Sequence, residues 1–183
     1  FGADEVSLSG TVDKNGGVHN SSLNSGIGFK ATDNILEPSK VSSVFNLAFK
    51  NELKSLNLQG VFLKELEWIP DSLGKLTWLT DLNLSGNRLE SLPDSIANLV
   101  NLMNLDVSAN QLVSLPESIG QLTSLEVLNI ENNKIEELPW TIGHCKSLME
   151  LKADFNHLKA IPEAIGNLAN LKILSLHYNC LKG

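Results

Sequence analysis

From about residue 53 onward, apolar and polar residues recur along the chain with a period of 23 residues. Five prolines and five asparagines keep this step: Pro70, Pro93, Pro116, Pro139 and Pro162, and Asn87, Asn110, Asn133, Asn156 and Asn179. A fixed period in this range is typical of repeat proteins, in which each unit buries its apolar residues against its neighbours. The pattern therefore predicts a solenoid of stacked units, and no other fold class explains it.

Each unit fits the motif LxxLxLxxNxLxxLPxxIxxLxx, which begins in one unit at Leu79. In the LxL segment, the period of two sends the leucines inward and the residues between them to the outer face of a short strand. The asparagine that follows can hydrogen-bond backbone groups of the turn, so the asparagines are expected to form a ladder. The Leu-Pro step favours an extended return, and IxxLxx has helical spacing on the opposite side.

This motif is that of leucine-rich repeats. The predicted fold class is α/β: a leucine-rich-repeat right-handed solenoid, with a short-strand parallel sheet on the concave face and helical or 3-10 turns on the convex face.

Three segments are expected along the chain. Residues 1–37 are rich in Gly, Ser and Asn and predict a flexible N-terminal segment. Residues 38–52 predict a capping helix, whose apolar face covers the first unit: Val41, Val44, Phe45 and Ala48. Residues 53–183 hold five full repeats and one partial repeat.

Both ends of the repeat array depart from the motif. In the first unit Val61 stands in place of the asparagine, and 26 residues separate Leu53 from Leu79. Trp68 and Trp78 of this irregular unit are expected to seal it against the capping helix. The chain ends within a repeat, so we expect a fragment whose last strand is an uncovered sheet edge, prone to pair with another chain.

Charge and cysteine content narrow the class of partner. The net charge of −7 repels nucleic acid and anionic membranes. No apolar run is long enough for a membrane span, and no cysteine-rich caps or signal sequence are evident. We therefore expect a cytoplasmic or nuclear protein without membrane insertion. The sequons at Asn20 and Asn83 carry little weight against this.

The outward strand residues form columns that are the best candidate surface for a protein partner. The first column is Asn57, Asn83, Asp106, Asn129, Lys152 and Ser175. The second is Gln59, Ser85, Ser108, Glu131, Asp154 and His177, and the third is Ser55, Asp81, Asn104, Val127, Glu150 and Ile173. The predicted partner-binding residues are Asn57, Asn83, Asp106, Asn129, Glu131, Lys152, Asp154, Phe155, His177 and Tyr178.

Three large aromatic residues have two interpretations each. Phe155 and Tyr178 either contact a partner as a hot spot or only pack on each other beside the asparagine turn. Trp140 stands where the other units have an acid, and packing over the adjacent turn is favoured over a role as an exposed anchor on the lateral surface.

No arrangement of residues supports catalysis. Cys145 and Cys180 lie outside any CxxC pair, and Cys145 replaces a leucine that the repeat would bury. No phosphate loop, paired acids or metal-ligand cluster is found, so we expect no enzyme activity, cofactor, metal or small-molecule substrate.

Several stretches resemble the plant intracellular Ras-group-related leucine-rich-repeat proteins. They are residues 66–70 (LEWIP), 72–76 (SLGKL), 158–166 (LKAIPEAIG) and 176–179 (LHYN). The resemblance spans roughly residues 38–183 and implies a plant intracellular scaffold with roles in signalling and development, including pollen formation. By analogy of repeat type, it suggests a small GTPase or another signalling protein as partner.

Two other functions remain open from the sequence. The chain could be an extracellular recognition domain of a receptor, which glycan mass on Asn20 or Asn83 would support. It could also be the substrate-recognition arm of a larger enzyme, such as a ligase.

Overall fold

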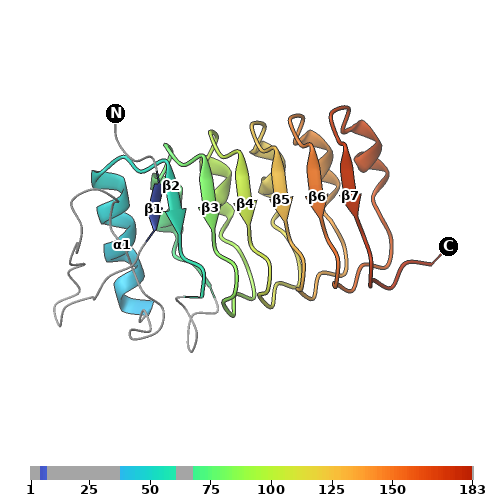
Figure 1. Ribbon diagram of the computed structural model, residues 1–183, viewed down its shortest axis with the longest axis horizontal. Coiled ribbons are helices and arrows are strands. Elements are labelled where there is room, and N and C mark those ends of the chain that lie inside the picture. Colours follow the sequence, from blue (N-terminus) through green and yellow to red (C-terminus); the bar gives the residue numbers. More distant parts are fainter. Residues whose placement is uncertain (1–4, 8–37, 61–67, 183) are drawn as a thin grey trace.

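The described part of the chain forms a right-handed stack of repeat units, and one helix lies at the N-terminal end of this stack. The structure is a computed structural model and describes residues 5–7, 38–60 and 68–182. Helix α1 spans Pro38–Lys50, and seven short strands follow the order of the sequence in one parallel sheet (Figure 1). The strands are β1 (Glu5–Ser7), β2 (Ser55–Asn57), β3 (Asp81–Asn83), β4 (Asn104–Asp106), β5 (Val127–Asn129), β6 (Glu150–Lys152) and β7 (Ile173–Ser175).

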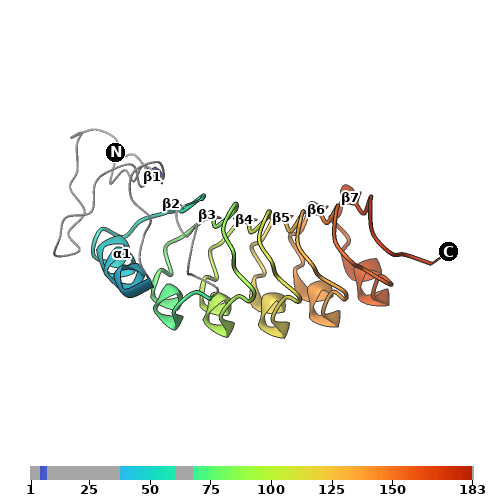
Figure 2. The ribbon, with the colours of Figure 1, turned by 90° about the horizontal axis from the view of Figure 1, so that it is seen from below.

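The two sides of the solenoid differ in their secondary structure. The strands line the concave side and one-turn 3-10 helices line the convex side (Figure 2). These helices are Asp71–Lys75, Asp94–Asn98, Glu117–Gln121, Trp140–His144 and Glu163–Asn167. The predicted leucine-rich-repeat solenoid is thereby confirmed.

Each strand from β2 to β7 is centred on the first leucine of its LxL segment. Leu82, Leu105 and Leu128 are at most 2% exposed, whereas the strand residues on either side of them are half-buried. The second apolar residue lies just after the strand and is also buried, as at Leu84 and Val107. The alternation predicted from the sequence therefore places the apolar residues inside and the polar columns outside.

The convex turns are 3-10 helices of five residues, and each follows an extended proline. In the third turn the Ile119 N–H donates to the Pro116 carbonyl, three residues back, at 3.0 Å. Gly120 permits the next unit to approach closely, since a Cβ there would lie 2.6 Å from the Thr141 carbonyl oxygen. The glycine therefore permits close stacking at this step, and Ala97 takes the same place in the preceding turn.

The asparagine ladder predicted from the sequence is present in the structure. The Nδ2 group of Asn133 donates to the carbonyls of Ile130 at 3.0 Å, Glu131 at 3.2 Å and Val107 of the preceding unit at 3.1 Å. Its Oδ1 accepts from the Leu112 N–H of the preceding unit at 3.0 Å. The same pattern joins neighbouring units at Asn110, Asn156 and Asn179. One side chain thus satisfies backbone groups in its own turn and in the turn before it.

Helix α1 buries the face that its sequence predicts. Its apolar residues are at most 3% exposed: Val41, Val44, Phe45 and Ala48. The helix ends at Lys50 rather than at residue 52, and Glu52 adopts a positive φ of 50°. The division of the chain into segments 1–37, 38–52 and 53–183 stays a prediction.

The two tryptophans of the first unit behave differently from each other. Trp78 contacts the helix through Phe49, with ring centroids 5.5 Å apart, as expected. Trp68 does not seal the unit: it is 59% exposed, while its neighbour Ile69 is buried. In an extended segment successive side chains point to opposite sides, and Ile69 takes the inner one.

The other predictions for the two ends of the repeat array concern residues that the structure describes only in part. Val61 lies outside them, as does most of the predicted flexible segment 1–37. Within that segment, Glu5–Ser7 forms β1 and pairs with β2, which the composition did not predict. At the other end β7 is an edge of the sheet, and Ile173 and Leu174 are 47% and 39% exposed. Its pairing with another chain stays a prediction.

Replacing one ladder asparagine tests the ladder directly. Asn133→Ala should lower the free energy of unfolding by at least about 2 kcal/mol, because it leaves a buried N–H and buried carbonyls without partners. Chemical denaturation measures this change. Asn167→Ala is the matched control, since Asn167 is exposed and its side chain has no hydrogen bond among the described residues; equal losses for the two variants would contradict the role of the ladder.

Candidate functional site

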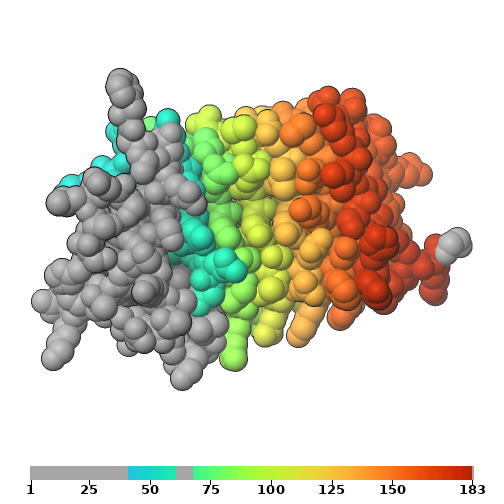
Figure 3. Space-filling view, in the orientation of Figure 1, coloured from blue at the N-terminus to red at the C-terminus, as the bar shows by residue number. Residues whose placement is uncertain are grey.

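The strand register brings the predicted columns together on one face. Asn57 pairs with Asn83, Asn83 with Asp106, and Asp106 with Asn129. Lys152 continues this column, and Ser55, Asp81, Asn104, Val127 and Glu150 form the column beside it. Figure 3 looks onto this face, where the units lie side by side as parallel bands.

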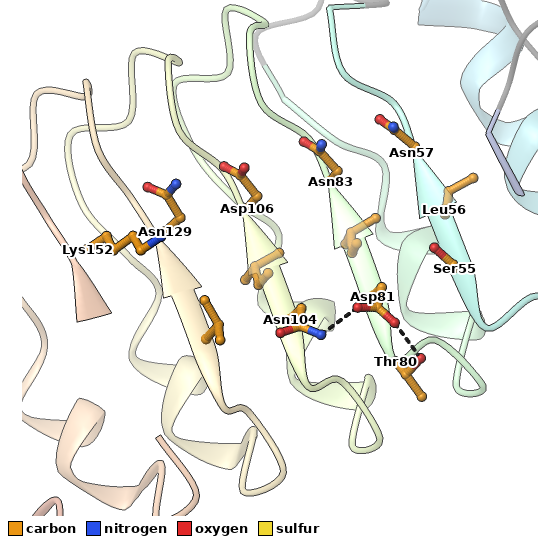
Figure 4. A pocket seen from close by; sticks show the side chains of 13 residues that line it. Ser55, Leu56, Asn57, Thr80, Asp81, Asn83, Asn104, Asp106, Asn129 and Lys152 are labelled. Carbon is orange, nitrogen blue, oxygen red and sulfur yellow. Dashed lines mark hydrogen bonds between the residues drawn. The ribbon is translucent and has the colours of Figure 1, made fainter. Parts of the chain in front are cut away.

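A groove of about 750 Å³ lies on this face over β2 to β6. Five of the predicted binding residues line it: Asn57, Asn83, Asp106, Asn129 and Lys152 (Figure 4). It is also lined by residues outside the predicted binding set: Ser55, Thr80, Asp81, Asn104 and Val127. Most of these belong to the third column, whose position in the repeat already indicated them. Thr80 precedes its strand, and the repeat register gave no signal for it.

Hydrogen bonds to the backbone fix how the first column presents its polar atoms. The Oδ1 of Asn83 accepts from the Ser85 N–H at 2.9 Å and from the Ser85 hydroxyl at 2.6 Å. Asn57 and Asn129 accept in the same way from the N–H two residues later. Since Oδ1 accepts from a backbone N–H, this hydrogen bond determines which way each asparagine amide is oriented. The Nδ2 group then points outward and can donate to a partner.

Asp106 makes the same turn with a carboxylate. Its Oδ1 accepts from the N–H and the hydroxyl of Ser108 at 2.9 and 2.6 Å. Its second oxygen, Oδ2, therefore lies where the asparagines of the column have Nδ2. The column thus has one acceptor at Asp106 among the donors of its asparagines. The groove consequently offers a fixed order of polar atoms, followed by the ammonium of Lys152.

Asp81 is already satisfied within the groove. It accepts hydrogen bonds from the Thr80 hydroxyl and from the Asn104 amide (Figure 4). This small network holds the third column in place. The donors and acceptors of the first column are therefore more available to a partner than those of the third column.

The predicted residues at the C-terminal end lie outside the groove and form a second cluster. Asp154 Oδ1 accepts from the Ser175 hydroxyl at 2.6 Å and from the His177 N–H at 2.7 Å, and His177 Nδ1 lies 3.6 Å from Oδ2. Burial alone would raise the pKa of Asp154, but these hydrogen bonds and the charge of His177 lower it below its ordinary value. Glu131 stands one unit earlier in the same column and also lies outside the groove.

Phe155 and Tyr178 pack on each other, as one of the two interpretations predicts. Their rings are stacked with centroids 4.4 Å apart and an interplanar angle of 7°. Both remain exposed, at 47% and 74%. Both also have left-handed backbone, with φ of 57° and 56°, a conformation that costs a non-glycine residue roughly 1–2 kcal/mol.

The structure corrects the interpretation of Trp140. The residue is 58% exposed. Its ring makes a T-shaped contact with His144 at the end of the same turn, with centroids 5.2 Å apart, and so covers only part of the turn. The corresponding residues Asp94, Glu117 and Glu163 are exposed as well, so this position faces outward in every such unit. A tryptophan placed there is exposed for the same geometric reason.

Cys145 is a buried apolar residue, as expected. It is fully buried, its thiol donates to the Ile119 carbonyl at 3.3 Å, and burial raises its pKa to about 11. Within the described residues, no group of three or more His, Cys, Asp or Glu side chains is arranged to hold a metal ion. None of the helices in these ranges has the length and hydrophobicity needed to cross a membrane.

Comparisons of sequence agree with the repeat pattern. The family described as "Leucine-rich repeat region" matches residues 105–181, and the family described as "Leucine Rich Repeat" matches residues 78–99. Plant intracellular Ras-group-related LRR protein 4 of Oryza sativa is 46% identical over 50 residues. That match covers 27% of this chain and 9% of the relative. The predicted resemblance to this group is confirmed for that stretch, which is a small part of the relative's length.

Solved structures show the same solenoid. An internalin of Listeria monocytogenes, at 24% identity and a TM-score of 0.66, shares the fold over 82% of this chain and 41% of its own. The LRR ectodomain of the Arabidopsis receptor kinase HAESA, solved with an IDA peptide hormone ligand, is 32% identical with a TM-score of 0.66. That similarity covers 75% of this chain and 24% of the ectodomain.

The environment of Asp154 predicts that its carboxylate contributes to stability. The carboxylate accepts two hydrogen bonds, and the side chain is only 18% exposed. Asp154→Ala should therefore lower the free energy of unfolding by about 1–2 kcal/mol.

The pH dependence gives this prediction a sign. Because the folded pKa of Asp154 is lowered, its charge stabilises the fold above the unfolded pKa of about 4, and this contribution is lost as the pH falls through the folded pKa. Asp154→Asn keeps an acceptor but removes the charge. The free energy of unfolding of this variant should be lower than that of the parent at about pH 7, and denaturation should show the difference shrinking as the pH falls to about 3. A difference that stays constant with pH would contradict the prediction.

Proposed function

This chain belongs to the leucine-rich-repeat proteins, and on that premise we propose that its concave sheet face binds another protein. The first-column side chains carry the proposal, because their outward atoms are held in a fixed order along a groove. Donors and acceptors that are already ordered lose little entropy on binding and discriminate between partners.

The chemistry of the groove suits a polar protein surface. A partner must place acceptors opposite Asn57, Asn83 and Asn129, and a donor opposite Asp106. Peptide groups and polar side chains supply both. The net charge of −7 opposes nucleic acid and anionic membrane surfaces. We also propose that the chain has no catalytic role and takes no small-molecule substrate.

An intracellular scaffold in plant signalling is the biological setting that we propose. The support is the 46% identity to a plant intracellular Ras-group-related LRR protein over 50 residues. A cytoplasmic or nuclear location and a partner such as a small GTPase follow from that similarity as proposals. They rest on analogy of family and repeat type.

A receptor-type recognition domain is the second candidate. Its support is the similarity to the HAESA ectodomain over 75% of this chain, a structure that holds a peptide hormone. The sequon at Asn83 separates the two candidates. A glycan on Asn83 would occupy the groove face, so glycan mass on this residue after expression in plant cells would favour a receptor type with a different binding surface.

A pair of substitutions tests the groove without disturbing its turns. Asn83→Asp with Asn129→Asp keeps the Oδ1 acceptor for each turn but turns two outward donors into acceptors. The expected result is at least about a tenfold loss of partner affinity with the unfolding free energy within about 1 kcal/mol of the parent. The measurement is affinity purification from plant cells, with binding of each identified partner then quantified by titration.

Two controls make the result specific. Gln121→Glu with Asn167→Asp adds the same charge on the exposed convex side and should leave capture unchanged. Trp140→Ala removes the exposed lateral ring and should also leave it unchanged. If the groove pair retains full capture while Trp140→Ala loses it, the lateral surface is the binding site and the proposal is wrong.

A further inference from the structure

One column of the turns carries a positive φ in every described unit. Its members are Gly60, Gly86, Ala109, Asn132, Phe155 and Tyr178. The conformation is imposed by the turn, since it recurs whatever residue occupies the position. Glycine and asparagine suit it, whereas bulky aromatic residues are the least suited to it.

The last two members are the aromatic pair, and little of the core depends on them. Phe155 and Tyr178 stack on each other, yet they remain 47% and 74% exposed. Their backbone strain is larger than that of Asn132 in the same column, because asparagine tolerates the left-handed region better than a bulky aromatic residue. Exposed residues kept against local preference indicate a binding role rather than a packing role.

The charges beside the pair are mainly acidic. Asp154 directly precedes Phe155, and Glu131 precedes Asn132 one unit earlier. The Asn132 N–H donates to the Asp154 carbonyl, which places these two units side by side at this point. The nearby cation Lys152 lies 3.8 Å from Glu150 in the neighbouring column, and the exposed imidazole of His177 lies 3.6 Å from the Asp154 carboxylate. This field favours a cation over an anion.

We propose that the stacked pair Phe155–Tyr178 receives an arginine side chain of the protein partner. A guanidinium is flat and cationic, so it stacks on an aromatic face while the acids Glu131 and Asp154 favour its charge. Because the two rings stack between neighbouring units, the face of Phe155 turned away from Tyr178 lies on the side of Asn132 and Glu131, and it is the ring surface available to the guanidinium. This inference rests on the proposed function, because it assigns part of the partner's chemistry to one end of the concave face.

Synthetic probes test the inference without knowledge of the partner. The probes are short fluorescent Gly/Ser peptides that carry arginine, lysine or citrulline at the same positions, titrated at low salt by fluorescence anisotropy. Lysine keeps the charge without the flat group, and citrulline keeps the flat group without the charge. The parent chain should bind the arginine peptide at least about fivefold more tightly than either control.

The matched variant is Phe155→Asn with Tyr178→Asn, which removes both rings and suits the left-handed backbone. It should lose the preference for arginine and keep its Tm within about 2 °C of the parent, since relief of strain offsets the lost stack. Glu131→Gln should weaken arginine binding, and Glu137→Gln, an exposed acid away from this column, should not.

Each other result overturns the inference. Equal binding of arginine and lysine or citrulline peptides by the parent would exclude guanidinium recognition. A retained preference in the double variant would place the arginine site elsewhere, and a fall in Tm of more than about 2 °C would make the pair a packing element. The groove proposal is tested separately, because Asn83→Asp with Asn129→Asp should leave the arginine preference intact; unchanged partner capture by that variant refutes the groove alone.

Discussion

The hydrogen bonds of the buried asparagines hold the rest of the structure in register. Each turn after a strand exposes backbone carbonyls and N–H groups to a dry interior, where an unpaired group is costly. One amide side chain pairs carbonyls in its own turn and in the unit before it, and accepts an N–H from that unit. The distance and rotation between units are therefore set at the turns as well as by the packing of leucines.

The binding face is a consequence of this constraint. Because the turns repeat in register, the outward residues of consecutive strands align into columns roughly 4.8 Å apart. Each first-column amide from Asn57 to Asn129 is then tied to the backbone two residues later, so its free atom points the same way in each unit. The left-handed column beside the ladder has the same origin, and it places Phe155 and Tyr178 in contact.

The sequence predicted what depends on the repeat and missed what depends on single side chains. The 23-residue period was enough for the ladder, the buried leucines and the columns, because burial and alternation determine them. The apolar face of α1 followed from helical spacing. The period could not show that Trp68 and Trp140 are exposed, since that depends on which side of an extended segment or turn each residue faces. The β1 strand at Glu5–Ser7 was missed because its surrounding composition predicts a flexible segment. The orientation of each amide and the hydrogen bonds of Asp154 depend on contacts between particular atoms, which a spacing pattern does not contain.

Hydrogen exchange at the ladder tests the account most directly. The N–H groups of Leu89, Leu112 and Ile135 donate to asparagine oxygens of the next unit. If the ladder holds the units together, these amides should exchange as slowly as those of the buried strand residues Leu105 and Leu128, through the same global opening. Exchange of the ladder amides that is orders of magnitude faster than that of the two strand amides would contradict the account, because the turns would then open independently of the sheet.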